Sequence, residues 1–517
     1  MSRIDRNLLV VEPYRRIRPT GELPFPVDYG MGSIVTEVEG GYSPTYDLVP
    51  RSEFLRELYP SGHKINSPLY YPDEYKQVEI KYQAEDGTTK TRQQWVKQKV
   101  DRVAVPFQYI IKTQHNIHLC GNNIMFRDSN HNPAQADKDL LVEFKQLWLD
   151  RNMESHFYAC VDSEHSTGDC LIVFYFDARK RIRARTYSYL DGYTICRPVY
   201  DPLTGEPLAQ AMKYFSYDEK DKAVCEYVDV WDTRKFMRLK RSYKGIGALY
   251  GSVMESLGLQ GYTVDIKPTE HGFPFLPLAY KRNRIGPAWS NSQHLCDTYD
   301  LGLSQACRNN RTLSTAIVFL AGGDADVKGM ADGRPYAIVS NDSSAKAEIL
   351  TYNDTSTAFD STLKTIKDNI FLGSFTVMPP EVRSGDLPGI AIKLIYSPSL
   401  DKAMDEAKAW DSFVDRMTMC FKYGMGVETG RVSDMDRMRI NGTIVPYVHE
   451  NTTELISNIC QAKLAGIMSV ETASNRNPYS ANDEFNMIRK EQRDERELEE
   501  QEASSMIRIT ENNNNNQ

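Results

Sequence analysis

Apolar residues recur with helical spacing on both sides of a proline- and glycine-rich interruption in the second half of the chain. Before it, four apolar residues step by four, three and four positions and share one face of a predicted helix: Phe359, Leu363, Ile366 and Ile370. Three prolines and two glycines between Met378 and Gly389 exclude a continuous helix, so a loop is predicted there. An ordinary helical hairpin in a globular core is the alternative interpretation.

A second, longer helix is predicted from Ile390. Its apolar residues again repeat with helical spacing: Leu400, Met404, Ala407, Trp410, Val414, Met417 and Phe421. Pro398 cannot donate an intrahelical hydrogen bond, so it is expected to bend the helix near its start.

A small β insertion is predicted between two helices just before this region. Ser290 or Ser292 can cap a helix that runs to about Arg311. Strands are predicted over residues 315–320 and 336–340, with a turn at Gly322–Gly323 after the first. The pattern predicts one helix leading out, a β module, and a second helix leading back.

The first half of the chain is predicted to hold an arm, then helices, then strands. Prolines and glycines without sustained periodicity over residues 1–50 predict an extended arm, laid over a neighbouring subunit if ordered. Stretches flanking Glu85-Asp86-Gly87 predict a hairpin over residues 77–92. Helices are predicted over residues 52–58, 103–123 and 137–151.

From Phe157 to Arg241 the apolar period changes to two. This period predicts successive short strands over residues 171–176, 182–189, 194–200, 209–217, 223–230 and 235–239. Such strands form a meander, which is predicted as an antiparallel sheet packed against the preceding helices.

The C-terminal part is predicted to be mainly helical. Met438 to Val448 is predicted as two short strands about Asn441-Gly442, Asn451 to Leu464 as a helix closed by Gly466, and Asn482 to Glu500 as a highly charged helix. The polar tail over residues 512–516 is expected to be disordered.

Composition narrows the class of protein. The formal net charge of −8 argues against a protein that grips nucleic acid by bulk electrostatics, but not against one that surrounds it. Nine cysteines stand singly without a CxxC pair, which predicts reduced core thiols and no disulfide. The apolar run from Leu8 to Val11 is too short for a signal peptide, and no run approaches the roughly 20 residues of a membrane span. We therefore expect a soluble protein that is not exported by such a route.

Motifs for enzymatic chemistry are not supported. The sequence has no phosphate-binding GxxxxGK[ST] loop, and no nucleophile, base and orienting residue can be assigned. Asp324 to Gly329 begins like a calcium loop, but Lys328 and Pro335 stand at ligand positions, which favours a turn. His115 and His118 could reach one metal ion from a helix, yet no further ligand lies nearby, so structural or surface histidines are favoured. No cofactor and no metal are predicted.

The ordered series of segments from about residue 95 to 500 resembles the portal proteins of tailed double-stranded DNA phages of the siphophage type. The segments that carry the resemblance are Val105–Phe126, Ala159–Tyr217, Phe273–Pro277, the DxYDxxxS motif of Asp297–Ser304, Gly389–Leu394, and the GxxSxxT motif of Gly466–Thr472. No single motif is strong, and their order and spacing define the likeness.

The resemblance implies an α+β portal fold. It would have an α+β wing with an antiparallel β meander, two stem helices, a small β clip, a long kinked wing helix and a mainly helical crown. The implied domains are an N-terminal arm and wing extension (1–94), the wing (95–285), the first stem helix (286–314), the clip (315–353), the second stem helix (354–372), the tunnel loop (373–389), the long wing helix (390–428), the crown (429–510) and a disordered tail (511–517).

The function implied by the resemblance is structural and not enzymatic. A homo-oligomer, expected to be a dodecamer, would form the channel for packaging and ejecting double-stranded DNA at the portal vertex of the capsid in the virion, after synthesis in the host cytoplasm. The implied partners are the large terminase, a head-completion or adaptor protein, and the major capsid and scaffold proteins, with no membrane.

Two groups of site residues follow from the implied domains. The residues expected to face DNA are Pro379, Glu381, Arg383, Ser384 and Lys393, and those expected to dock terminase and adaptor are Asp324, Asp326, Lys328 and Arg334. Arg383 and Lys393 are the basic points of the expected channel lining. Another head–tail connector or tail component, or a nucleic-acid enzyme with a divergent site, remain the alternative functions.

Overall fold

The computed structural model of the chain falls into two compact units. The first comprises residues 1–378 and 398–447, and the second comprises residues 379–397 and 448–517. The structure describes residues 6–12, 14–17, 46–83, 89–97, 100–130, 135–243, 262–313, 317–321, 325–331, 334–340, 346–350, 356–378, 393–447, 452–477, 479–480 and 484–497. About half of the chain is helical and a quarter is strand, so the α+β class predicted from the sequence is confirmed.

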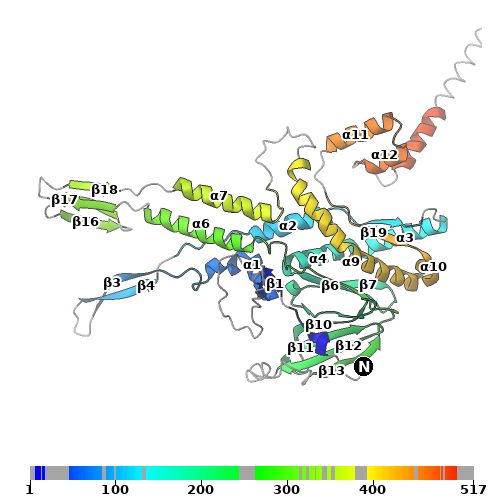
Figure 1. The fold of residues 1–517 in the computed structure, drawn as a ribbon, viewed down its shortest axis with the longest axis horizontal. Helices are drawn as coiled ribbons and strands as arrows, with labels where there is room; N and C mark the ends of the chain where they lie inside the picture. Colours follow the sequence, from blue (N-terminus) through cyan, green and yellow to red (C-terminus); the bar gives the residue numbers. More distant parts are fainter. Residues whose placement is uncertain are drawn as a thin grey trace, which may run out of the picture. The chain divides into compact units, whose positions relative to one another are not determined.

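The main hydrophobic core of the first unit is built around one long helix, α9 (Ser397–Thr429). Its apolar residues pack against helices α3 (Gln135–Asp150) and α4 (Met153–Thr167) (Figure 1). The ring of Phe421 lies 5.1 Å from that of Trp148, and the ring of Trp410 lies 5.5 Å from that of Phe157. Aromatic contacts of this kind add to the free energy gained by burial.

Two details of α9 differ from the sequence prediction. Met404 is exposed and Ala403 is buried in its place, because the buried stripe is shifted by one residue in the first turns. Pro398 is the second residue of the helix. The N–H groups of the first turn have no intrahelical acceptor, so a proline at this position breaks no helix hydrogen bond. The interruption instead falls at Tyr396, between a helical turn at residues 393–395 and the start of α9.

The strands between Asp169 and Arg282 form two antiparallel sheets instead of the expected single meander. One sheet has the order β14-β6-β7 and the other the order β13-β12-β11-β10-β8, with β9 also paired to β10. Pro198 separates β8 from β9, so the strand predicted over residues 194–200 is split. The bounds are β6 (Asp169–Phe176), β7 (Ile182–Tyr187), β8 (Thr194–Ile195), β9 (Val199–Tyr200), β10 (Pro207–Asp218), β11 (Ala223–Asp232), β12 (Lys235–Tyr243), β13 (Thr263–Glu270) and β14 (Leu278–Arg282).

Residues 157–167, which the period-two pattern assigned to the β region, belong to the helix α4. Polar residues at buried positions of this helix, among them Ser163, Glu164 and His165, hide its apolar stripe from a sequence-based analysis. The helix ends at Gly168, whose φ of +86° suits glycine at a helix C-terminus. The prediction of strand periodicity from residue 157 is therefore wrong.

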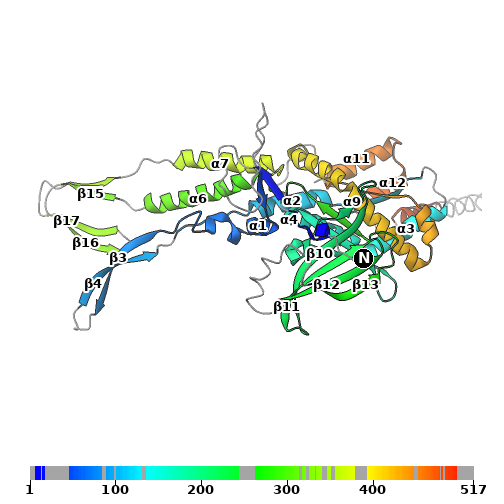
Figure 2. The ribbon, with the colours of Figure 1, turned by 60° about the horizontal axis from the view of Figure 1, so that its bottom comes forward.

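The predicted pair of helices with a β module between them is present. Helix α6 (Gln293–Leu313) begins directly after Ser292, and α7 (Ser356–Gly373) lies beside it in both views (Figures 1 and 2). Between them are two antiparallel strand pairs, β15 with β18 and β16 with β17. Their bounds are β15 (Ile317–Ala321), β16 (Ala325–Ala331), β17 (Arg334–Ser340) and β18 (Lys346–Leu350). Residues 325–329, expected in a turn, belong to β16.

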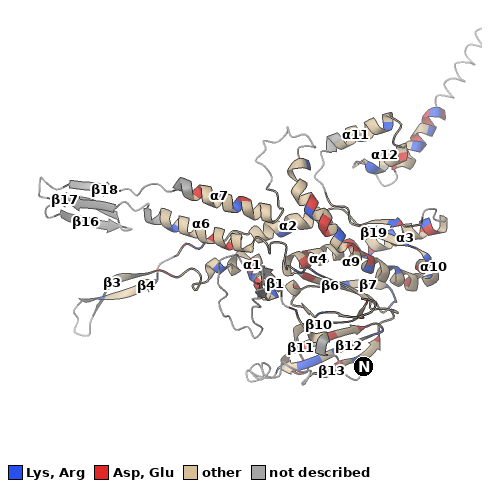
Figure 3. Cartoon of the chain, in the orientation of Figure 1, with Lys and Arg blue, Asp and Glu red and all other residues tan. Residues whose placement is uncertain are grey.

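The apolar face predicted for α7 points into the protein. Leu363 and Ile370 are buried, Phe359 and Ile366 are half-buried, and the opposite side exposes charges of both signs (Figure 3). Ile370 and Phe371 share a second core with Phe107 of α2 (Phe107–Cys120). The same core includes Trp289, which lies just before α6.

The acidic and hydroxyl residues of the DxYDxxxS motif fix the base of α6. Asp300 accepts hydrogen bonds from the Val105 amide at 2.9 Å and faces His63 Nδ1 at 2.7 Å. Ser304 Oγ accepts from the Val103 amide at 2.9 Å. The motif residues therefore tie α6 to the segment that enters α2, which gives this sequence pattern a structural role.

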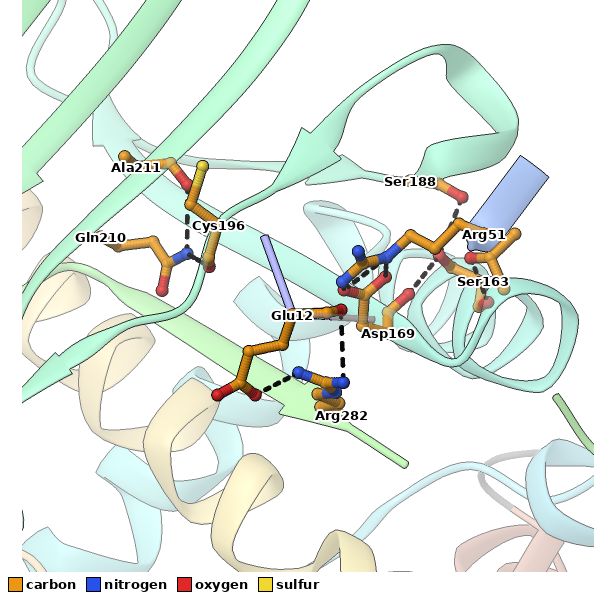
Figure 4. Close-up of polar contacts among 10 residues, drawn as sticks. Glu12, Arg51, Ser163, Asp169, Ser188, Cys196, Gln210, Ala211 and Arg282 are labelled. Atoms are coloured by element: carbon orange, nitrogen blue, oxygen red, sulfur yellow. Dashed lines mark hydrogen bonds and ion pairs between the residues drawn. The ribbon is translucent and has the colours of Figure 1, made fainter. Parts of the chain in front are cut away.

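Parts of the first 50 residues pack on their own chain, which differs from the predicted arm laid over a neighbouring subunit. Within the described residues, η1 (Arg6–Leu9) and the strand pair β1 (Tyr14–Ile17) and β2 (Tyr46–Val49) belong to the first unit, and Leu8, Tyr14 and Val49 are buried in the cores of their own chain. Arg282 pairs with Glu12 and ties this region to β14 (Figure 4).

A buried ion pair fixes helix α1 (Arg51–Leu58) to β6. Arg51 Nε lies 3.1 Å from each carboxylate oxygen of Asp169, and both side chains are almost fully buried (Figure 4). Ser163 Oγ donates to the Asp169 carbonyl at 2.7 Å and lies 2.8 Å from Ser188 Oγ, which adds α4 to the same network. Because water is excluded from this ion pair, each charge depends on the other for compensation.

The remaining helices and strands of the first unit are short. They are η2 (Pro60–Gly62), η3 (Lys64–Asn66), β3 (Tyr75–Gln83), β4 (Thr89–Lys97), β5 (Met125–Asp128), η4 (Tyr189–Asp191), α10 (Val432–Arg437) and β19 (Ile440–Thr443). The hairpin predicted around residues 85–87 is confirmed as β3 and β4.

The hairpin predicted about Asn441-Gly442 is wrong. Both residues lie inside β19, which pairs with β5. A Cβ atom at Gly442 would stand 2.8 Å from Val414 Cγ1 and 3.0 Å from Phe126 Cε1. Glycine is therefore required here for close packing and not for a turn.

The second unit is helical in its described residues. It contains α11 (Thr452–Leu464), α12 (Val470–Arg476) and a helix over residues 484–497. Gly466 has φ +72° just after α11, as the sequence predicts for a helix end. Ser469 caps α12 by accepting from the Thr472 amide at 3.2 Å, so the GxxSxxT motif is a helix-capping sequence.

Two compositional expectations can be compared with the structure. All nine cysteines are free, but Cys460 is exposed, so the expectation of core thiols does not hold for it. Among the described residues, no helix combines the length and the apolar character that crossing a membrane requires.

Replacing Arg51 by methionine should strongly destabilise the first unit. The Asp169 carboxylate would remain buried without its partner, which lowers the free energy of unfolding by about 3–5 kcal/mol. Arg56→Met is the matched control, because Arg56 belongs to the same helix and forms an exposed pair with Glu53 that contributes about 0–1 kcal/mol. Midpoints of thermal unfolding measure the difference, and equal midpoints for the two variants would refute this role of the buried pair.

Candidate functional site

The candidate site is a group of contacts at the two ends of the segment predicted as the DNA-facing loop. Residues 379–392 of that segment lie outside the described residues, and the chain is described again on both sides of it. On its N-terminal side, α7 ends at Gly373 and residues 374–377 form a tight turn. The turn is closed by bonds from the Ser374 amide to Ile370 O at 3.1 Å and from the Thr376 amide to Phe371 O at 2.9 Å.

Phe375 gives this turn an uncommon backbone conformation. Its φ is +56°, in the left-handed region that bulky residues rarely adopt. Such a conformation persists only where surrounding contacts enforce it. Ser374 Oγ provides one such contact by donating to Ile370 O at 2.8 Å.

Helix α2 holds the turn from one side. Gln114 makes two bonds to Val377, donating from Nε2 to its carbonyl at 2.9 Å and accepting from its amide at 3.2 Å. One position further along, His115 Nε2 lies 2.8 Å from the Ser374 carbonyl oxygen. Because a carbonyl only accepts, Nε2 of His115 carries the proton.

Helix α9 holds the turn from the other side. Ser399, in its first turn, donates from Oγ to the Phe375 carbonyl at 2.8 Å. We call this group the loop clamp: Gln114 and His115 of α2, the turn 374–377, and Ser399 of α9. It fixes the chain just before residues 379–392 to the chain that follows them.

A buried cluster of ionisable groups lies directly behind the loop clamp. Glu406 of α9 is 3.5 Å from His165 Nε2 of α4 and 3.7 Å from His115 Nδ1 of α2. These are distances of ion pairs rather than of ordinary hydrogen bonds. Glu164 also lies 3.5 Å from His165 Nε2, so two carboxyl groups face one imidazole.

The charge states of this cluster follow from burial and from the neighbours. Burial raises the pKa of Glu406, but its interactions with His165, His115 and Lys402 outweigh burial and lower the pKa to about 2. Burial lowers the pKa of His165, and the carboxylate of Glu406 raises it above its ordinary value. Near neutral pH, therefore, Glu406 is ionised and a protonated His165 is favoured beside it.

For the other two members of the cluster, His115 and Glu164, burial disfavours the charged form. Burial lowers the pKa of His115 to about 4, so its imidazole is neutral near pH 7. Burial raises the pKa of Glu164 to about 7. The cluster thus contains one compensated ion pair and two groups for which burial favours the neutral form.

Further polar residues extend the cluster across α2 and α4. His165 Nδ1 lies 2.7 Å from Asn116 Oδ1, and Asn116 Nδ2 donates to Asp162 at 2.7 Å. Lys112 Nζ is 2.8 Å from the same Asp162 oxygen. This arrangement suits mechanical support of the turn.

A metal ion is not favoured at either place considered. His115 and His118 turn to different partners, the carbonyls of Ser374 and Tyr447, which agrees with structural histidines. Within the described residues, one group has the spacing of metal ligands: Asp218, Asp221 and Cys225. Lys240 Nζ lies 2.6 Å from Asp218 and 2.7 Å from Asp221, so its ammonium group already neutralises these carboxylates.

The structure describes only part of the predicted site residues. Pro379, Glu381, Arg383, Ser384 and Asp324 lie outside the described residues. Lys393 is exposed in the helical turn before α9. Asp326 and Lys328 are in β16 and Arg334 is in β17, so these three share one strand pair. Their roles toward DNA, terminase and adaptor stay predictions.

Sequence analysis missed most of the loop clamp. The sequence does not single out Gln114, Ser374 or Ser399, nor Glu406 in the cluster behind the clamp, and for His115 it favours a structural or surface role without indicating a partner. One usable signal was Glu406 beside the apolar positions of α9, because a charge at the edge of a buried stripe requires a partner.

Comparison with known proteins supplies the class of this protein. The profile of a family described as phage portal protein, SPP1 Gp6-like, matches residues 49–498. The chain therefore belongs to this family of phage portal proteins, which are structural components of the phage particle. The match begins well before residue 95, where the resemblance seen in the sequence began.

Two further comparisons were made. No curated protein matches the sequence. Among solved structures, the chain is similar to one described as the neck of an empty GTA particle computed with C6 symmetry, with 9% identity and a TM-score of 0.39. The similar region covers 71% of this chain and 91% of that chain.

Replacing Gln114 by alanine should open the turn at Phe375. The amide and carbonyl of Val377 would lose their partners, at a cost of about 1–3 kcal/mol, so we expect chymotryptic cleavage after Phe375 to accelerate by about tenfold. Gln146→Ala is the control, because Gln146 bonds only to Asp150 on an exposed helix surface. Mass spectrometry of the fragments gives the rates, and an unchanged rate in Gln114→Ala would show that α2 does not hold the turn.

Proposed function

We propose that copies of this chain form a closed ring of twelve subunits at the portal vertex of a phage capsid, and that double-stranded DNA is packaged and ejected through its channel. Membership of the portal family over residues 49–498 is the observation that carries the proposal. A closed ring requires heterologous contacts, in which one face of each copy meets a different face of the next.

The tunnel loop, residues 373–389, would border the channel in this ring. The loop clamp supports this proposal, because it anchors the start of the segment, residues 374–377, to two helices that are themselves packed in the main core. A segment held in this way can contact moving DNA while its supports stay fixed. Pro379, Glu381, Arg383, Ser384 and Lys393 are the proposed DNA-facing residues.

The acidic character of the chain suits a conduit. Each phosphate that a protein neutralises strengthens attachment and steepens its dependence on salt. With a formal net charge of −8 per copy, the ring would repel DNA overall and touch it only at isolated basic points. Arg383 and Lys393 are proposed as those points.

The clip, residues 315–353, is proposed to dock the large terminase during packaging and a head-completion or adaptor protein afterwards. Its two strand pairs lie between α6 and α7 in the order of the chain. Asp326, Lys328 and Arg334 lie on one of these pairs and are proposed to contact the partners.

Removing the clip should separate docking from assembly. We expect a variant in which Leu313 is joined to Ser356 by a short linker to form rings in electron micrographs but to lose terminase binding. A variant that ends after residue 497 serves as the control and should retain both properties. If the clip deletion still binds terminase, the docking site lies elsewhere; if the intact chain gives only monomers or two-fold dimers, the ring itself is refuted.

Reversing one charge should separate DNA transport from assembly. Arg383→Glu is expected to reduce packaging of DNA while rings form normally, because it removes a basic point of the channel lining. Arg383→Lys, which keeps the charge, is expected to package nearly as well as the unaltered chain. Packaged DNA per assembled ring is the measurement, and an equal loss of packaging and assembly would place Arg383 in a subunit interface.

A further inference from the structure

The hairpin of β3 and β4 forms a sheet that is too small to be stable by itself. Nine residue pairs join the strands, from Tyr75 opposite Lys97 to Gln83 opposite Thr89. Among the described strands, none adds a third strand to this sheet (Figure 1). A two-stranded ribbon in water is marginally stable at best, so it requires a further contact surface.

Large apolar side chains of this hairpin are exposed. All residues from 91 to 97 are exposed, which means that both faces of β4 are uncovered. Trp95 is 63% exposed and its neighbour Val96, on the opposite face, is 41% exposed. Tyr75, which the register places diagonally opposite Trp95 on the same face, is 58% exposed.

Trp95 is unlike every other tryptophan of the chain. The protein has five tryptophans, and all of them are described. Trp148, Trp231, Trp289 and Trp410 are at most 5% exposed. An exposed tryptophan on a narrow ribbon is the kind of side chain that forms the centre of protein interfaces.

The base of the hairpin is firmly attached. Glu74 accepts from Arg308 of α6 at 2.6 Å, and Asp73 pairs with Lys97 and Arg102, each at 2.7 Å. Hydrogen bonds from Lys97 and Arg102 lower the pKa of Asp73, so this carboxylate stays charged. The ribbon therefore starts from a fixed position beside the helix α6.

The charge of the two strands is opposite to that of the chain. They carry five basic residues, Lys76, Lys81, Lys90, Arg92 and Lys97, against one acidic residue, Glu79. The whole chain has a formal net charge of −8. A second copy of the same protein is therefore a surface to which this ribbon is electrostatically attracted.

We propose that the hairpin β3–β4 docks on a neighbouring copy of this chain, with Trp95 buried at the contact. The proposal deepens the proposed function, because it rests on the assembly of copies into a ring. Nucleic acid is the competing occupant for a basic ribbon. It is less favoured because apolar residues lie on both faces of the ribbon: the register places Val78, Ile80 and Tyr82 on the face of Val96, opposite to Trp95. Exposed apolar surface of this kind marks a site that binds protein.

Fluorescence of Trp95 distinguishes these occupants. In the dissociated chain, acrylamide should quench mainly Trp95, because the other four tryptophans are buried. Assembly into rings should abolish this accessible fraction, and adding double-stranded DNA to dissociated chains should leave it unchanged. Trp95→Phe serves as the control that identifies the signal.

A pair of variants tests how much the proposed contact of Trp95 contributes to ring formation. Trp95→Glu should raise the protein concentration required for ring formation by about tenfold or more, as expected for the loss of an aromatic anchor. Trp95→Phe should change it little. Because Trp95 is exposed in the single chain, both variants should unfold thermally like the unaltered protein when they are dissociated.

The outcomes separate the docking proposal from the proposed ring. Rings in which Trp95 is quenched as in dissociated chains, or rings of Trp95→Glu that form at the usual concentration, would overturn the docking of the hairpin and leave the ring intact. Protection of Trp95 by DNA alone would assign the ribbon to nucleic acid. If the unaltered chain forms no ring at any concentration, the proposed function fails as well.

Discussion

The ion pair between Glu406 and His165 is the interaction on which the arrangement behind the loop clamp depends. It brings a carboxylate of α9 against an imidazole of α4, and His115 of α2 faces the same carboxylate. Two charges removed from water are tolerated only when each stays close to the other. Any shift of one helix along its neighbours would leave a buried charge without compensation. The three helices are therefore restricted to one relative position, and the apolar contacts of Phe157 and Trp410 fill the space around it.

The fixed position of these helices also holds the turn 374–377 in place. Gln114 and His115 hold it from α2, and Ser399 holds it from α9, so the left-handed backbone at Phe375 is enforced by helices that cannot move independently. A residue in such a conformation stores free energy that the surrounding contacts must supply. In the proposed ring this would be a favourable place for it, because the segment that follows would start from the same position in every subunit.

Sequence patterns predicted the elements that bury a single apolar face. They failed for elements that bury polar residues or a glycine. The helix α7 has one apolar face, so Phe359, Leu363, Ile366 and Ile370 were sufficient to predict it. The helix α4 buries Ser163, Glu164 and His165, and the strand pattern after it was therefore extended too far. Gly442 was interpreted as a turn residue, although its role is to admit Val414 and Phe126, which only the packed structure reveals. The loop clamp was missed for the same reason: Gln114, Ser374 and Ser399 are ordinary polar residues in sequence, and their bonds to backbone atoms join positions far apart in the chain.

The distribution of charge connects the channel with the assembly of the ring. A wall that lets DNA slide has to bind phosphates weakly, which an acidic protein achieves by keeping its cations few and separate. The same acidic charge makes identical copies repel one another, so that ring formation needs contacts that overcome this repulsion. Under the proposed docking of the hairpin, a basic ribbon with an exposed tryptophan would provide both an attraction to the acidic neighbour and an apolar surface to bury. In the proposed ring, positive charge concentrated on the hairpin, at a distance in sequence from residues 373–389, would allow strong contacts between subunits without strong contacts to DNA.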